Sequence, residues 1–170
     1  QQVIGFNFGE LLGDQPAFER SAAQVLKHFH GRYELVCHAV FGGDVPVIKR
    51  IIAAAGLPAG AVRMERHHFA PHLFMQSVRN YSAFLGMRLH AAGFAMVAGV
   101  PSLMVAYRPK TRDFMAPLGK EDLLVDLPMD VDQTIARLEQ ILSRPDQAIL
   151  TDRIAAIAAE QRIRLKAAFQ

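Results

Sequence analysis

The chain has 170 residues, of which 51% are hydrophobic and 21% charged, a balance typical of a folded domain with one substantial core. This composition argues against intrinsic disorder. The formal net charge of +3, with no run of basic residues interleaved with aromatics, argues against a nucleic-acid partner. No apolar run reaches the length of a membrane span, and the N-terminus lacks the basic segment and apolar core of a signal peptide. Cys37 is the only cysteine, which excludes an intramolecular disulfide, and we expect a reducing, cytoplasmic location.

Short apolar strands and helix-compatible segments alternate along the chain. The expected strands cover residues 3–8, 34–41, 61–65, 83–87, 102–106 and 123–126. The expected helices cover residues 16–30, 46–55, 71–79, 89–98, 131–142 and 146–168. Pro46 in a first turn, Gly56 after a last turn and Asp130 before the helix at 131–142 are typical start and stop signals.

The strands are mostly continuous apolar runs, which is typical of parallel sheets buried on both faces. We therefore predict an α/β fold, a doubly wound, Rossmann-like parallel sheet with helices on both faces. We expect a single domain over 1–170 that ends in a long helix over 146–170. Because the chain begins with Gln rather than Met, we also expect a second lobe to precede it in a longer protein.

One segment is strongly basic. From Arg66 to Arg112 there is no Asp or Glu. Its cations are Arg66, Arg79, Arg88, Arg108, Lys110 and Arg112, and its histidines are His67, His68, His72 and His90. Such a bias favours an anionic ligand.

The same segment places Arg88, Leu89 and His90 between an expected strand and an expected helix. In a parallel sheet, ligands gather at the carboxyl ends of the strands, where helix N-termini offer unpaired N–H groups. Small residues at 91–93 leave that helix end open to an anion. Arg88 can add a bidentate contact, and Lys110 follows the next strand on the same edge. His90 is the candidate acid or phosphate ligand, since imidazole titrates near neutrality.

The stretches GMRLHA (86–91), AGVP (98–101) and YRPK (107–110) together resemble the C-terminal half of polysaccharide pyruvyl transferases. The close match runs from Phe84 to about Leu118. The resemblance implies one lobe of a two-lobed enzyme built like the GT-B glycosyltransferases. That enzyme would transfer a pyruvyl group from phosphoenolpyruvate to hydroxyls of a glycan acceptor, with no cofactor and no metal. It would bind phosphoenolpyruvate through Arg88, Leu89, His90 and Lys110, with Arg88 and His90 in the catalysis.

Two other functions stay open. The first is the donor lobe of a nucleotide-sugar glycosyltransferase, although such lobes generally carry a ribose-binding carboxylate on the helix that here spans 89–98 and has none. The second is a non-catalytic anion-binding module. Dinucleotide binding is disfavoured, because residues 7–10 (NFGE) after the first strand lack the Gly-x-Gly-x-x-Gly pattern.

Polar residues near the ends of the first two strands are further candidates for the same cleft: Asn7, Glu10, His38 and Asp44. A turn after Gly42-Gly43 also explains Asp44. We expect no metal at His67, His68 and His72 but exposed side chains, because adjacent histidines point in different directions and we expect no carboxylate near them.

Overall fold

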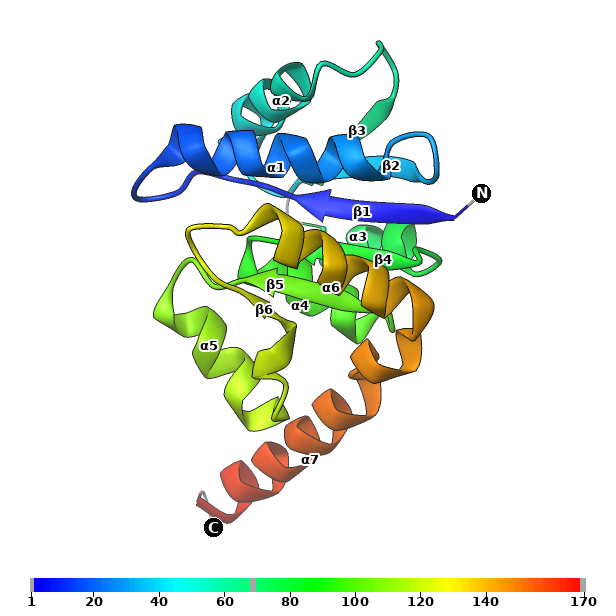
Figure 1. Cartoon of the computed structure of the whole chain (residues 1–170). Helices are drawn as coiled ribbons and strands as arrows, with labels where there is room; N and C mark the ends of the chain where they lie inside the picture. The colour runs from blue at the N-terminus through cyan, green and yellow to red at the C-terminus, as the bar shows by residue number, and fades with distance from the viewer. Residues whose placement is uncertain (1, 68–69, 169–170) are drawn as a thin grey trace.

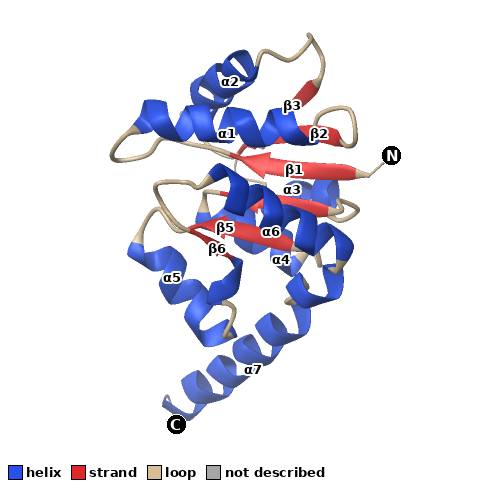
Figure 2. Ribbon diagram, in the orientation of Figure 1, coloured by secondary structure: helices blue, strands red, loops and turns tan. Residues whose placement is uncertain are grey.

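The computed structural model describes residues 2–67 and 70–168, the side chains of 147 and 161–168 excepted. Within these ranges the strands form one parallel sheet in the order β3-β2-β1-β4-β5-β6 (Figures 1 and 2). The strands are β1 (Val3–Asn7), β2 (Glu34–Ala39), β3 (Val62–Arg66), β4 (Ala83–Gly86), β5 (Ser102–Val105) and β6 (Leu124–Val125). The order reverses between β1 and β4, the point where ligands gather in sheets of this kind.

Helices cover both faces of the sheet, as Figure 1 shows. They are α1 (Gln15–Phe29), α2 (Asp44–Ala55), α3 (Pro71–Val78), α4 (Leu89–Val97), α5 (Pro109–Met115), α6 (Val131–Ser143) and α7 (Thr151–Ala168). Helix α1 packs between α2 and α6 on one face, and α3 packs against α4 on the other. The doubly wound α/β fold predicted from the sequence is therefore confirmed.

Neighbouring strand residues supply two separate cores. Leu85 packs into the larger core with α1, α2 and α6, whereas Phe84 packs into the smaller one with α3 and α4. Both side chains are fully buried, which explains why the strands read as continuous apolar runs. Cys37 is buried in β2, and burial raises the pKa of its thiol well above the usual range.

Two parts of the chain after β5 differ from the prediction. Helix α5 (Pro109–Met115) was not expected, so Lys110 lies in a helical first turn rather than in a loop. Helix α7 begins at Thr151, not at residue 146, because Pro145–Ala148 forms a 3-10 turn after α6. Residues 169 and 170 of the expected long helix lie outside the described residues.

Glycine at the end of β4 sets how closely α4 approaches the sheet. A Cβ on Gly86 would lie 2.7 Å from the Cβ of Ala92, so a larger residue would push α4 away. The expected N-cap of α6 is confirmed, since Asp130 Oδ1 accepts a hydrogen bond from the Gln133 amide at 2.9 Å. Among the described residues, no helix combines the length and apolar character that crossing a bilayer requires.

Candidate functional site

A small cleft of about 160 Å³ lies at the carboxyl ends of the strands. We call it the Arg88 cleft; its lining comes from the segments after β2, β4 and β5 and consists of Phe41, Arg88, Leu89, His90, Tyr107, Arg108 and Lys110. Four of these residues were singled out from the sequence alone: Arg88, Leu89, His90 and Lys110. The structure brings them together, and the roles expected for them stay predictions.

The N-terminus of α4 opens beside this cleft. Arg88 occupies the N-cap position with an extended backbone and without a side-chain cap, so the first N–H groups of the helix have no capping side chain. His90 and Lys110 are exposed in the first turns of α4 and α5. An anion in the cleft would meet these side chains and the positive end of the α4 dipole.

Arg88 already holds an anionic partner. Its Nε and Nη2 donate to Asp44 Oδ1 at 3.0 and 2.8 Å, and its guanidinium lies over the Phe41 ring. Burial opposes the charged form of Arg88, but hydrogen bonds and the charge of Asp44 outweigh it and raise the pKa of Arg88. The bidentate contact expected between Arg88 and a ligand is thus made with Asp44, and this edge of the guanidinium is not open to a second anion.

Asp44 is the buried centre of this arrangement rather than a solvated turn residue. Its side chain is fully buried, and its Oδ2 accepts hydrogen bonds from the backbone amides of Val40 and Phe41 at 3.2 and 3.1 Å. Together with the two bonds from Arg88, these amides satisfy both carboxylate oxygens. Asp44 therefore fixes the loop after β2 and the start of α4 relative to each other.

Asn7 joins the same network from β1. Its Oδ1 accepts from the Arg88 amide at 2.9 Å, and its Nδ2 donates to the His38 carbonyl at 2.9 Å. The Asn7 side chain therefore ties the ends of β1 and β2 to the start of α4. Asn7 acts beneath the cleft instead of lining it, and Glu10 is exposed and absent from the lining.

Gly9 is the residue that the sequence reading did not connect with Arg88. A Cβ at this position would lie 2.6 Å from both Arg88 Nε and Asp44 Oδ1. Only glycine leaves room for the ion pair at this point of the loop after β1. The sign of this role in the sequence was a glycine two residues after an apolar strand. Its neighbours Asp44 and Arg88 lie 35 and 79 residues further along the chain, so the sequence did not connect them.

The basic segment is partly neutralised in space by carboxylates from outside it. Asp44 pairs with Arg88, and Asp126 pairs with Arg112. Arg108 and Lys110 form no ion pair with any other residue that the structure describes. Two cations without a carboxylate partner among the described residues therefore lie in the lining of the Arg88 cleft.

A second, apolar hollow of about 310 Å³ adjoins this cleft. We call it the Phe74 pocket; its walls include the rings of Phe41, His67, Phe74, His90 and Phe94. Phe41 and His90 line both hollows. The site is therefore a cationic cleft with an aromatic-walled pocket beside it.

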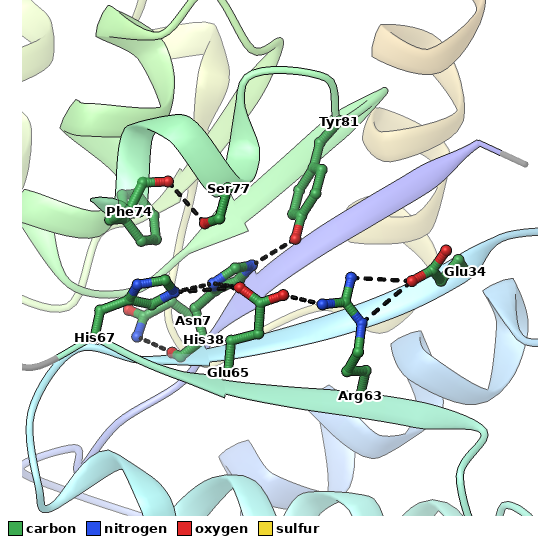
Figure 3. A network of polar contacts seen from close by, with 9 residues as sticks. All are labelled: Asn7, Glu34, His38, Arg63, Glu65, His67, Phe74, Ser77 and Tyr81. Atoms are coloured by element: carbon green, nitrogen blue, oxygen red, sulfur yellow. Dashed lines mark hydrogen bonds and ion pairs between the residues drawn. The ribbon is translucent and has the colours of Figure 1, made fainter. Parts of the chain in front are cut away.

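The expectation that His67 is exposed and has no carboxylate nearby is wrong. His67 Nε2 lies 2.9 Å from His38 Nδ1 and 3.5 Å from Glu65 Oε2, and its side chain is only 11% exposed (Figure 3). His38 is fully buried and does not line the Arg88 cleft. His72 is exposed, as expected, and His68 lies outside the described residues.

No family model matches the chain, and no curated protein is similar enough to count as a relative. Solved structures do share its fold. UDP-GlcNAc 2-epimerase from Neisseria meningitidis, bound to UDP-GlcNAc, matches 89% of this chain and 38% of its own length, with TM-score 0.60 and 14% identity. A UDP-forming trehalose-phosphate synthase from Burkholderia xenovorans matches 94% of this chain and 40% of its own length, with TM-score 0.60 and 19% identity.

The molybdenum cofactor carrier protein from Chlamydomonas reinhardtii matches 84% of this chain and 99% of its own length, with TM-score 0.57 and 16% identity. At these identities the likeness shows the Rossmann-like fold alone. The chain spans about two fifths of the length of the two longer enzymes.

Proposed function

We propose that this chain is the donor-binding lobe of a glycan-modifying transferase and that the Arg88 cleft holds the phosphorylated end of the donor. One observation carries the proposal: the open N-terminus of α4 meets, at one cleft, the cations Arg108 and Lys110, which form no ion pair with any described residue. Phosphate oxygens accept hydrogen bonds from such N–H groups and are attracted by such cations.

The first candidate for the donor is a nucleoside diphosphate sugar. The aromatic walls of the Phe74 pocket suit a planar base, and the pocket adjoins the cleft at Phe41 and His90. The similarity in fold to enzymes named for UDP-GlcNAc and for UDP formation favours the same ligand class.

The second candidate is phosphoenolpyruvate, as in pyruvyl transfer. It is favoured by the Arg88-Leu89-His90 triplet, which resembles that family, and by the absence of any carboxylate on α4. A volume of about 160 Å³ suits a small phosphorylated acid better than a complete nucleotide. His90 would then bind the phosphate or protonate the methylene carbon, as the resemblance implies.

Calorimetry on the chain separates the candidates, with UDP, pyrophosphate, phosphoenolpyruvate and inorganic phosphate as probes. A nucleotide donor predicts that UDP binds at least about tenfold more tightly than pyrophosphate, a difference of about 1.4 kcal/mol. A pyruvyl donor predicts that phosphoenolpyruvate binds more tightly than both.

Equal binding of all four probes would contradict both donors. It would favour a module that binds anions without turnover. Binding that resists removal of Lys110 would contradict the Arg88 cleft as the location.

A further inference from the structure

The geometry points to a zinc-binding site, formed by His38, Glu65 and His67, beside the Phe74 pocket. Strand register brings the three residues together. His38 is paired with Glu65 across the parallel strands β2 and β3, so both side chains leave the same face of the sheet. His67 follows Glu65 by two residues, and its amide continues the ladder by donating to the Ala39 carbonyl at 2.9 Å. The two-residue period of a strand therefore returns His67 to the same face.

The three donor atoms have the spacing of a ligand set. His38 Nδ1, His67 Nε2 and Glu65 Oε2 are separated by 2.9, 3.5 and 3.7 Å. One point lies about 2.0 Å from all three atoms, which is the usual length of zinc bonds to imidazole nitrogen and carboxylate oxygen. This point lies in the plane of the three donor atoms. A tetrahedral site with bonds of this length has donors about 3.3 Å apart, so the 2.9 Å contact must widen and the 3.7 Å contact must shorten by about 0.4 Å each.

Outer partners orient two of the three ligands (Figure 3). His38 Nε2 lies 3.1 Å from the Tyr81 hydroxyl, so Tyr81 can accept the Nε2 proton and leave the Nδ1 lone pair for a metal. Arg63 donates to Glu65 Oε1 and leaves Oε2 toward the histidines. Such hydrogen bonds to the remote atoms of the ligands are the usual support of a zinc site.

The chemistry of the set selects the metal. Neutral imidazole offers a ring-nitrogen lone pair to a metal, and His38 Nδ1 and His67 Nε2 face each other at 2.9 Å. Two imidazoles and one carboxylate suit Zn²⁺, whereas Mg²⁺ and Ca²⁺ prefer oxygen ligands. Three protein ligands leave a fourth tetrahedral position, and His67 lies in the wall of the Phe74 pocket.

The test uses Zn²⁺ alone in calorimetry and Co²⁺ alone in visible spectroscopy, on the metal-free chain. We expect one Zn²⁺ per chain and intense Co²⁺ absorption of the tetrahedral type. His67→Ala should weaken Zn²⁺ binding by about a hundredfold or more, and Tyr81→Phe by about tenfold through loss of the partner of His38. Zn²⁺ should also raise the Tm of the wild type more than that of His67→Ala.

His72→Ala is the matched control, since His72 is exposed on α3 and outside the cluster. It should bind Zn²⁺ as the wild type does. Circular dichroism verifies that each variant is folded, and Glu65→Gln replaces His67→Ala if that variant is not. Failure of the wild type to bind one Zn²⁺ would overturn the site. So would a folded His67→Ala or Glu65→Gln variant that binds Zn²⁺ as tightly as the wild type does. Loss of binding in His72→Ala would place the metal elsewhere.

Discussion

Two polar clusters lie side by side at the carboxyl ends of the strands and differ in how their groups are satisfied. In the first, Asp44 has a cation, two backbone amides and a neighbouring carboxamide around a single carboxylate. In the second, His38 and His67 face each other and Glu65. His38 Nδ1 and His67 Nε2 share a single hydrogen bond, so only one of the two nitrogens carries a proton there. A cluster with every group satisfied fixes the backbone, whereas two imidazole nitrogens and a carboxylate that face one another form a set of ligands for a cation.

Removing Asp44 breaks the first cluster most severely. Asp44→Ala leaves the half-buried Arg88 guanidinium and two backbone amides without their acceptor, so we expect a loss of about 3 kcal/mol in the free energy of unfolding. Urea denaturation measures the loss. Asp44→Asn, which keeps the shape and one acceptor oxygen, should be less destabilised. A loss below about 1 kcal/mol in the free energy of unfolding of Asp44→Ala would show that water replaces Asp44 as the acceptor for Arg88.

Crowding the same cluster should cost less than removing its centre. Gly9→Ala places a methyl group 2.6 Å from Arg88 Nε and Asp44 Oδ1, and the forced displacement should cost about 1 to 3 kcal/mol. Gly42→Ala is the control, because a Cβ there meets no atom within 4 Å. The same denaturation experiment compares them, and equal stability of both variants would argue against a rigid ion pair.

The exposed cations of the cleft should affect binding and not stability. Lys110→Ala should weaken pyrophosphate binding by about five- to tenfold, or about 1 kcal/mol, and leave the unfolding midpoint unchanged. Lys49→Ala, an exposed lysine on α2, is the control and should bind as the wild type does. The difference between the two variants should shrink as salt is raised, because exposed charges are screened. A difference that persists at 1 M salt would contradict an electrostatic origin.

The smallest effect is expected at an exposed ion pair. Arg112 and Asp126 are paired with side chains 55% and 65% exposed, in contrast to the buried carboxylate of Asp44. Arg112→Ala should change the free energy of unfolding by less than about 1 kcal/mol. A larger loss would mean that exposure is a poor guide to the strength of ion pairs in this protein.

Local patterns predicted the sheet, because fully buried strands leave apolar runs that need no knowledge of the tertiary structure. The common position of Arg88, His90 and Lys110 followed from one rule about parallel strands. Helix α5 was not predicted, because the charged stretch after Tyr107 is also typical of a loop. The sign of the helix was Pro109, which is its first residue.

The partners of the site residues were not predictable in the same way. Asp44 lies 44 residues before Arg88, and only the folded loop after β2 brings them together. The pairing of His38 with Glu65 depends on the register of β2 and β3, which a single sequence does not specify. The available sign was the Glu-x-His spacing at 65 and 67, which places both side chains on one face of a strand.

The shared wall of the two hollows has a consequence for ligand size. A molecule that fills the Arg88 cleft and the Phe74 pocket together must pass Phe41 and His90, and it loses its freedom of translation and rotation only once. Two separate fragments each bear that loss. Bridging molecules are therefore favoured over pairs of small ones, and linking two weak fragments across Phe41 should multiply their affinities rather than average them.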